Sequence, residues 1–111
     1  MNWITLNDEK QLETIKEQSK EQPVVIFKHS TRCSISAMAL NRLERASQPE
    51  GVLFYFLDLI ANRAVSNKVA EIFGVHHESP QVLVIRNGEC IYDDSHSGIS
   101  MDDIAAQATA A

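Results

Sequence analysis

The chain has 111 residues, of which 44% are hydrophobic and 23% are charged, a composition typical of a single globular domain over residues 1–111. Its formal net charge of −5 argues against a nucleic acid or an anionic membrane as the main partner. Because the sequence shows neither a signal-peptide pattern nor a run of about 20 apolar residues that would span a membrane, we expect a cytoplasmic protein, and a monomer.

The first part of the chain alternates between strand and helix patterns. Residues 3–6 form a short strand candidate, and Asn7 is a plausible N-cap for a helix that follows it. Leu12 and Ile15 lie on one face of this helix. Residues 24–28 are then an apolar run without alternation, which is typical of a central strand covered by helices on both faces.

A second helix and a third strand follow. Apolar residues at steps of three and four predict a helix from about Cys33 to Ala46. Residues 52–57 form another buried strand, which closes at Asp58. Residues 63–73 are again helical, and Gly74 is well placed as the left-handed residue that ends the helix.

The last part of the chain predicts a hairpin and a helix. Residues 82–86 and 89–93 are strands, and Asn87-Gly88 between them is the strongest short hairpin signal. Gly98 turns the chain, Ser100 can cap, and residues 101–108 form a final helix before terminal alanines that we expect to fray. The order β-α-β-α-β-α-β-β-α predicts an α/β fold, with a mixed central sheet and helices on both faces.

Cys33 stands where the second predicted strand ends and the second helix begins. At such a position the free N–H groups and the positive end of the helix dipole favour the thiolate. Lys28, His29 and Arg32 add positive charge from neighbouring positions. The sequence therefore predicts that Cys33 is a nucleophile.

These residues also have purely structural interpretations. A free cysteine is often a small buried core residue, and Lys28 and His29 can be solvated charges at a strand end. The adjacent His76 and His77 suggest a metal ion, but adjacent side chains diverge and no third ligand is evident, so no metal site is expected. Two cysteines in a chain of this size are not a disulfide framework, which favours a reducing compartment.

Four features, in this order, resemble the thioredoxin fold over nearly the whole chain. They are a cysteine at a helix start, a Ser-Pro pair before an apolar strand, an Asn-Gly hairpin, and a glycine turn before the last helix. The residues that carry them are Cys33, Phe73-Gly74-Val75 with Ser79-Pro80-Gln81-Val82-Leu83-Val84-Ile85, Arg86-Asn87-Gly88-Glu89, and Gly98-Ile99-Ser100. The resemblance implies a thioredoxin-like fold with Pro80 in the cis form. It also implies that Cys90, beside the hairpin turn, is structural and lies at the sheet end away from the site.

The motif around the cysteine resembles that of the monothiol bacilliredoxins, thiol–disulfide proteins of the bacillithiol system. It reads Thr31-Arg32-Cys33-Ser34-Ile35-Ser36, with a serine where thioredoxins carry a second cysteine. A serine hydroxyl is a very poor nucleophile toward sulfur, so a mixed disulfide on Cys33 must await a thiol from outside. The resemblance implies bacillithiol as the cosubstrate, no bound cofactor, and bacillithiolated proteins and a low-molecular-weight thiol as partners.

The residues around the sulfur have expected roles in this chemistry. Ser36, one helical turn on, is expected to donate to the thiolate from its hydroxyl and Ser34 from its backbone N–H; plain polar residues in a first helical turn are the alternative. Arg32 is expected to contact a carboxylate of the small thiol, and His29 to shuttle protons. Contacts to the substrate or the small thiol are expected from Thr31, Ser79, Pro80, Gly98 and Ile99.

Two functions of other classes remain open from the sequence. One is a non-catalytic binding module that uses a thioredoxin fold as an adaptor. The other is an iron–sulfur carrier, with one Cys33 from each protomer of a dimer and external thiols as ligands. The Cys-Gly-Phe-Ser motif typical of monothiol glutaredoxins is absent, because Ser34 and Ile35 stand in place of its glycine and phenylalanine.

Overall fold

The computed structural model describes residues 1–109 and shows one five-stranded sheet in the order β1-β3-β2-β4-β5. Strand β2 lies at the centre, parallel to β3 and antiparallel to β4, and this confirms the expected mixed sheet. The strands are β1 (Trp3–Thr5), β2 (Val24–His29), β3 (Leu53–Asp58), β4 (Gln81–Arg86) and β5 (Glu89–Ser95).

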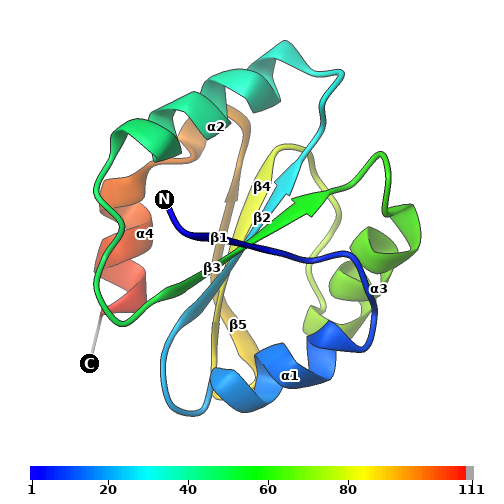
Figure 1. Ribbon diagram of the computed structural model, residues 1–111, viewed down its shortest axis with the longest axis vertical. Helices are drawn as coiled ribbons and strands as arrows, with labels where there is room; N and C mark the ends of the chain where they lie inside the picture. Colours follow the sequence, from blue (N-terminus) through cyan, green and yellow to red (C-terminus); the bar gives the residue numbers. More distant parts are fainter. Residues whose placement is uncertain (110–111) are drawn as a thin grey trace.

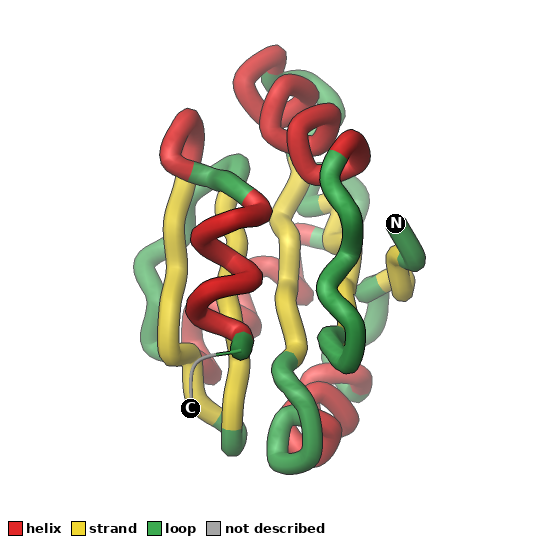
Figure 2. Tube along the Cα trace, turned by 90° about the vertical axis from the view of Figure 1, so that its left-hand side faces the viewer, coloured by secondary structure: helices red, strands yellow, loops and turns green. Residues whose placement is uncertain are grey.

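Helices cover both faces of the sheet and make a three-layer molecule (Figures 1 and 2). Helices α2 and α4 pack on one face, and α1 and α3 pack on the other. Their bounds are α1 (Gln11–Gln18), α2 (Ser34–Arg45), α3 (Arg63–Phe73) and α4 (Met101–Ala108), with a short 3-10 turn, η1 (His96–Gly98), before α4.

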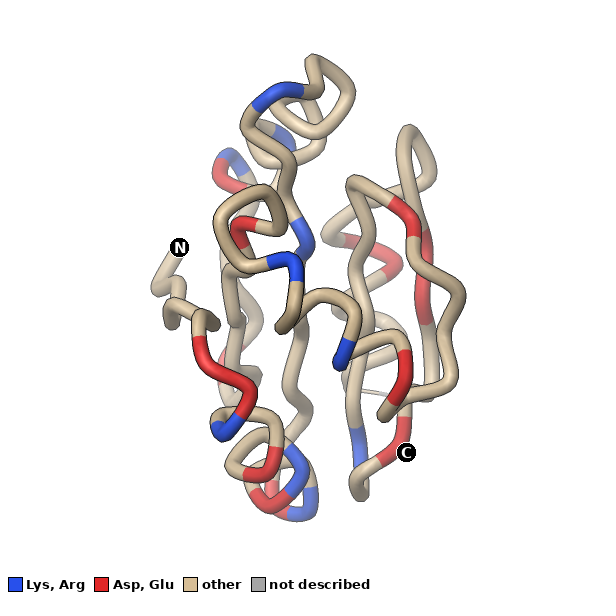
Figure 3. The backbone as a smooth tube through the Cα atoms, turned by 90° about the vertical axis from the view of Figure 1, so that its right-hand side faces the viewer, with Lys and Arg blue, Asp and Glu red and all other residues tan. Residues whose placement is uncertain are grey.

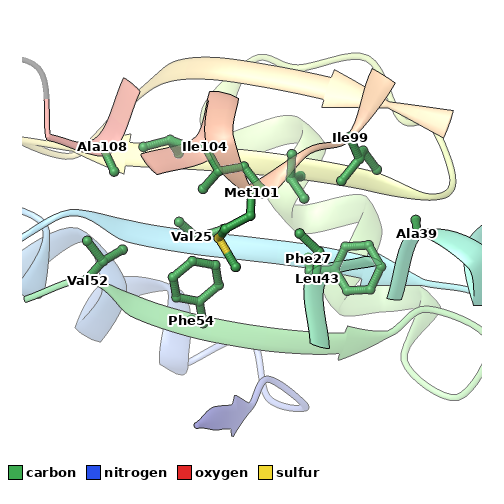
Figure 4. Close-up of a cluster of buried hydrophobic side chains, with 12 residues drawn as sticks. Val25, Phe27, Ala39, Leu43, Val52, Phe54, Ile99, Met101, Ile104 and Ala108 are labelled. Atoms are coloured by element: carbon green, nitrogen blue, oxygen red, sulfur yellow. The ribbon is translucent and has the colours of Figure 1, made fainter. Parts of the chain in front are cut away.

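Each of the two helix layers is held to the sheet by its own apolar cluster, because successive side chains of a strand point to opposite faces. Figure 4 shows the cluster under α2 and α4, in which side chains from both helices meet Val25 and Phe27 of β2 and Phe54 of β3. The cluster under α1 and α3 takes the alternate strand positions, including Val24 and Ile26. Strand β2 is buried along its whole length. The burial of residues 24–27 follows from their apolar pattern, whereas the interpretation of Lys28 and His29 as solvated charges is wrong.

The register brings three segments to one end of the sheet. His29, the last residue of β2, pairs with Asp58, the last residue of β3. Lys28 pairs with Gln81, the first residue of β4, and Gln81 pairs with Ser95, the last residue of β5. The segments that follow β2, precede β4 and follow β5 therefore lie at the same end of the molecule.

Most local signals are confirmed. Gly74 adopts the left-handed conformation with φ of 64° after α3, and Asn87 and Gly88 have φ of 53° and 77° in the hairpin turn. Ser100 caps α4, because its Oγ accepts the Asp103 N–H at 3.1 Å. The final alanines that we expect to fray, at 110 and 111, lie outside the described residues.

The boundaries that differ most from the prediction are the start of α1 and the end of β5. Asn7 is not the N-cap of α1, because the helix begins at Gln11 with Lys10 as its cap residue. The Gln11 side-chain oxygen instead accepts hydrogen bonds from the N–H groups of Asn7 and Asp8 at 2.8 and 3.0 Å. The segment before the helix is therefore held by the first residue of the helix. Strand β5 continues to Ser95, two residues beyond its predicted end at Asp93, because it pairs with β4 as far as Gln81.

Charges are mixed over the surface. Figure 3 shows basic and acidic positions interspersed rather than gathered in a block of one sign. Among residues 1–109, no helix combines the length and the apolar character needed to cross a bilayer.

Candidate functional site

Cys33 is the N-cap residue of α2, with an extended backbone at φ −117° and ψ 121°. Its carbonyl accepts the Ala37 N–H at 3.1 Å, so the N–H groups of the first helical turn, from Ser34 to Ser36, lie at the helix end beside the sulfur. The side chain is half-buried and belongs to neither apolar cluster. The interpretation of Cys33 as a core residue is therefore wrong.

A buried hydrogen-bond chain ties the end of β2 to the first turn of α2. Ser36 is fully buried, and its Oγ accepts the Ser30 N–H at 3.0 Å and lies 2.8 Å from His29 Nδ1. Burial lowers the pKa of His29, against the opposing effect of Asp58, and so favours a neutral ring. The structure shows no hydrogen bond from this hydroxyl to the Cys33 sulfur; among residues 1–109 its contacts are with the Ser30 N–H and His29 Nδ1. Ser36 instead fixes the turn that carries Cys33.

This arrangement gives a testable expectation for stability. Replacing Ser36 with alanine leaves the Ser30 N–H and His29 Nδ1 without their buried partner, and we expect a loss of about 1–3 kcal/mol in the free energy of unfolding. The matched control is Ser34→Ala two residues earlier, where the side chain is exposed and the change should stay within about 0.5 kcal/mol. Urea unfolding of both variants measures the difference, and equal stabilities would show that the Ser36 bonds contribute nothing.

Lys28 does not lie where the sequence reasoning placed it. Its side chain is fully buried on the α1 and α3 face of the sheet, whereas its neighbour His29 points to the α2 face. The Lys28 Nζ donates to the Ser66 carbonyl and to His77 Nδ1, each at 3.2 Å. The expected contribution of Lys28 to the charge around Cys33 is therefore corrected, because the sheet lies between its ammonium group and the layer that contains α2.

The loop before β4 lies at the same sheet edge as Cys33 and contains a cis Ser79-Pro80 peptide bond, as predicted. The Pro80 carbonyl accepts the His96 N–H at 3.0 Å, which joins this loop to η1. Within residues 1–109, no hydrogen bond involves the backbone of Ser79, and its Oγ is buried without a partner. The Ser79 backbone is thus available to pair with an incoming extended chain.

The turn at Gly98 and Ile99, from which contacts to the substrate or the small thiol are expected, is occupied by groups of the protein itself. The Ile99 N–H donates to the His96 carbonyl at 3.4 Å, and the Asp94 carboxylate lies so close to Gly98 that a Cβ there would be 2.5 Å from Asp94 Oδ1. An acidic side chain already at the turn disfavours a second carboxylate. Sequence reasoning also missed Arg42, whose guanidinium holds this turn to α2 by donating to the carbonyls of Ile99 and His96.

The other residues of the motif line the approach to the sulfur. Thr31, Arg32 and Ser34 are exposed around the half-buried Cys33, and the Arg32 N–H donates to Ser30 Oγ at 3.4 Å. Ile35, also exposed, adds an apolar side chain to this surface. The structure therefore brings together Thr31, Arg32, Ser34 and Cys33 at one accessible helix start.

Cys90 lies at the far end of the sheet. It pairs with Ile85 beside the hairpin turn, whereas the site lies at the end of β4 that begins with Gln81. Its Sγ donates to the Tyr92 carbonyl at 3.3 Å, and burial raises the pKa of its thiol. Cys90 lies away from the site, as expected, and is not placed to reach Cys33. No group of three or more metal-binding side chains occurs among residues 1–109.

Comparisons with known proteins agree with this geometry. The model of the monothiol bacilliredoxin BrxC family matches residues 4–104. A solved structure described as a putative oxidoreductase with a thioredoxin fold is 31% identical, with a TM-score of 0.82 and coverage of 94% of this chain and 91% of that chain. Thioredoxin from Malassezia sympodialis is 18% identical, with a TM-score of 0.78 and coverage of 98% and 92%. Thioredoxin from Fasciola hepatica is 17% identical, with a TM-score of 0.75 and coverage of 95% and 98%.

Proposed function

Because the chain belongs to the monothiol bacilliredoxin family and has the thioredoxin fold, we propose that it is a thiol–disulfide oxidoreductase that removes bacillithiol from protein mixed disulfides. The observation that carries this proposal is a single accessible thiol at a helix start, with the other cysteine at the opposite end of the sheet. Cys33 caps α2, the position of a second cysteine is taken by the buried Ser36, and Cys90 lies at the opposite end of the sheet.

The proposed reaction has two exchange steps. The Cys33 thiolate attacks the bacillithiol sulfur of a protein–bacillithiol disulfide, the old S–S bond breaks, and the target cysteine leaves as a thiolate that takes up a proton. A new disulfide then joins Cys33 to bacillithiol. A second thiol from outside attacks that bond and restores the Cys33 thiolate, since the Ser36 hydroxyl cannot. The target is reduced, and the outside thiol is oxidised to a disulfide with bacillithiol.

Several residues support these steps without reacting. The N–H groups at the start of α2 stabilise negative charge on the sulfur, both before attack and after release. Arg32, which is exposed and precedes Cys33 in the chain, is proposed to bind a carboxylate of the small thiol. The free Ser79 backbone can pair with the extended chain on either side of the target cysteine, as an added strand pairs with a sheet edge. The proposed setting is the reducing cytoplasm, where such thiolates persist.

The experiment that tests this function uses one target protein carrying different small thiols in mixed disulfide. Release of the target thiol is followed for disulfides with bacillithiol, glutathione and cysteine, each with an excess of the matching free thiol. We expect the bacillithiol disulfide to be reduced fastest. Equal rates for all three would contradict the specificity, and no catalysis of any of them would contradict the oxidoreductase function.

A further inference from the structure

Lys28 is a buried cation without a counter-charge. Its side chain has no exposed surface, and among residues 1–109 no carboxylate lies within ion-pair distance of its Nζ. Its cross-strand neighbour on β3 is Leu57, and Ile26 and Leu83 belong to the apolar cluster on the same face of the sheet. Burial lowers the pKa of Lys28 to about 8. An apolar side chain of similar length would suit this position better for stability, so packing alone does not explain the lysine.

The contacts of Lys28 join three parts of the molecule. From β2, its Nζ donates to the Ser66 carbonyl of α3 and to His77 Nδ1 in the loop before β4. Burial and the nearby Lys28 charge lower the pKa of His77, which favours a neutral ring with an accepting nitrogen. Ser66 Oγ lies 3.4 Å from the same nitrogen.

A second buried polar side chain holds His76, the loop residue before His77. Gln81 is 2% exposed, pairs directly with Lys28 across β2 and β4, and points to the same face. Its Nε2 donates to the His76 carbonyl at 2.9 Å. Two neighbouring interior side chains therefore fix two successive loop residues, His76 and His77, and His77 lies two residues before the unpaired Ser79 backbone.

We propose that Lys28 is a positioning residue that, together with Gln81, holds the 74–80 loop so that the Ser79 backbone is presented to the protein disulfide. The inference rests on the proposed function, because it assigns this loop the role of gripping the substrate chain. Lys28 acts on substrate affinity from the opposite face of the sheet, and the reactivity of the Cys33 sulfur does not depend on it.

The test compares Lys28→Met, which keeps most of the length of the side chain but removes its donors, with the wild-type protein. We expect the KM for a bacillithiolated protein to rise roughly tenfold, the equivalent of one to two hydrogen bonds, with little change in kcat. Alkylation of Cys33 by iodoacetamide should proceed at the wild-type rate. The matched control is Lys20→Met on the surface after α1, which should change none of these quantities.

Two further measurements separate positioning from a purely structural role. His77→Phe should raise KM by a similar factor. The double variant with Lys28→Met should have a KM no higher than either single variant, because both substitutions remove the same contact between Lys28 and His77. A side chain needed only for folding would lose stability together with affinity, whereas Lys28→Met is expected to raise the unfolding midpoint while KM rises.

Hydrogen exchange keeps the inference testable even if bacillithiolated proteins are not the substrates. In Lys28→Met, the backbone amides of the 74–80 loop should exchange roughly tenfold faster than in the wild type, while those at the start of α2 stay unchanged. Unchanged exchange in the loop, or an unchanged KM, would overturn the role of Lys28. A wild-type protein that reduces no mixed disulfide would overturn the proposed function alone.

Discussion

Replacing Cys33 with serine is expected to reduce the rate of mixed-disulfide reduction by roughly a thousandfold or more, down to the uncatalysed background. The reaction forms a bond from this sulfur, and a serine hydroxyl cannot take part in thiol–disulfide exchange, so no alternative path remains on the protein. The measurement is release of the target thiol from a bacillithiolated protein under excess reducing thiol. Because Cys33 is half-buried outside both apolar clusters, we expect the variant to fold normally.

The matched control for this prediction is Cys90→Ser. Cys90 lies beside the hairpin turn, at the end of β4 opposite the site, so this variant should keep its kcat within about twofold even if it loses some stability. A large loss of activity in Cys90→Ser with its fold intact would mean that the second thiol takes part in the cycle. Substantial activity in Cys33→Ser would remove the basis of the proposed function.

Replacing Lys28 with methionine is expected to stabilise the protein at neutral pH. The pKa of Lys28 is about 8 in the folded chain, against 10.5 for a free lysine side chain, so the unfolded chain holds its proton more firmly. At pH 7 this difference destabilises the wild type by about 3 kcal/mol. Methionine avoids that cost but loses two hydrogen bonds of about 1 kcal/mol each, so we expect a net gain of about 1–2 kcal/mol.

The advantage of Lys28→Met should vanish as the pH rises. Between pH 8 and 10.5 the folded chain has released the Lys28 proton and the unfolded chain still binds one, so wild-type stability rises relative to the variant. Above this range only the lost hydrogen bonds remain, and the variant should be less stable by about 1–2 kcal/mol. Urea unfolding at pH 7 and at pH 10.5 measures the change. If the free energies of unfolding of the two proteins differed by the same amount at both pH values, Lys28 would not be a buried ammonium group without a counter-charge.

The comparison between variants is needed because other groups titrate in the same range. Burial raises the pKa of Cys90, and burial with the nearby Asp94 raises that of Tyr92 to about 12. Both groups stabilise the folded chain below their unfolded pKa, and this contribution is lost as the pH rises through their folded pKa. Since both are present in the wild type and in Lys28→Met, their effects cancel in the difference.

Much of the fold followed from local sequence signals. The order of strands and helices is readable because apolar periodicity, Gly74 after α3 and Asn87-Gly88 in the hairpin each depend on a few neighbouring residues. The position of Cys33 at a helix start is predictable for the same reason. The cap of α1 was missed because the Gln11 side chain takes over the N–H groups that Asn7 was expected to satisfy.

The parts of the site that depend on distant residues were not predictable. Alternation along β2 implies that Lys28 and His29 point to opposite faces, but the sequence does not say which face α2 covers. The contacts of Lys28 reach residues 38 and 49 positions away, and those of Arg42 reach residues more than 50 positions away. Only the sheet register and the packing of the helices bring these groups together.

The central claim is that one sulfur forms the mixed disulfide and that no second sulfur of the protein can resolve it. Intact-mass spectrometry after reaction with a bacillithiolated protein, in the absence of free thiol, tests this directly. We predict one bacillithiol adduct per chain, located on Cys33 by peptide mapping and stable until a low-molecular-weight thiol is added. An unmodified Cys33, or a disulfide between Cys33 and Cys90 in place of the adduct, would contradict the account.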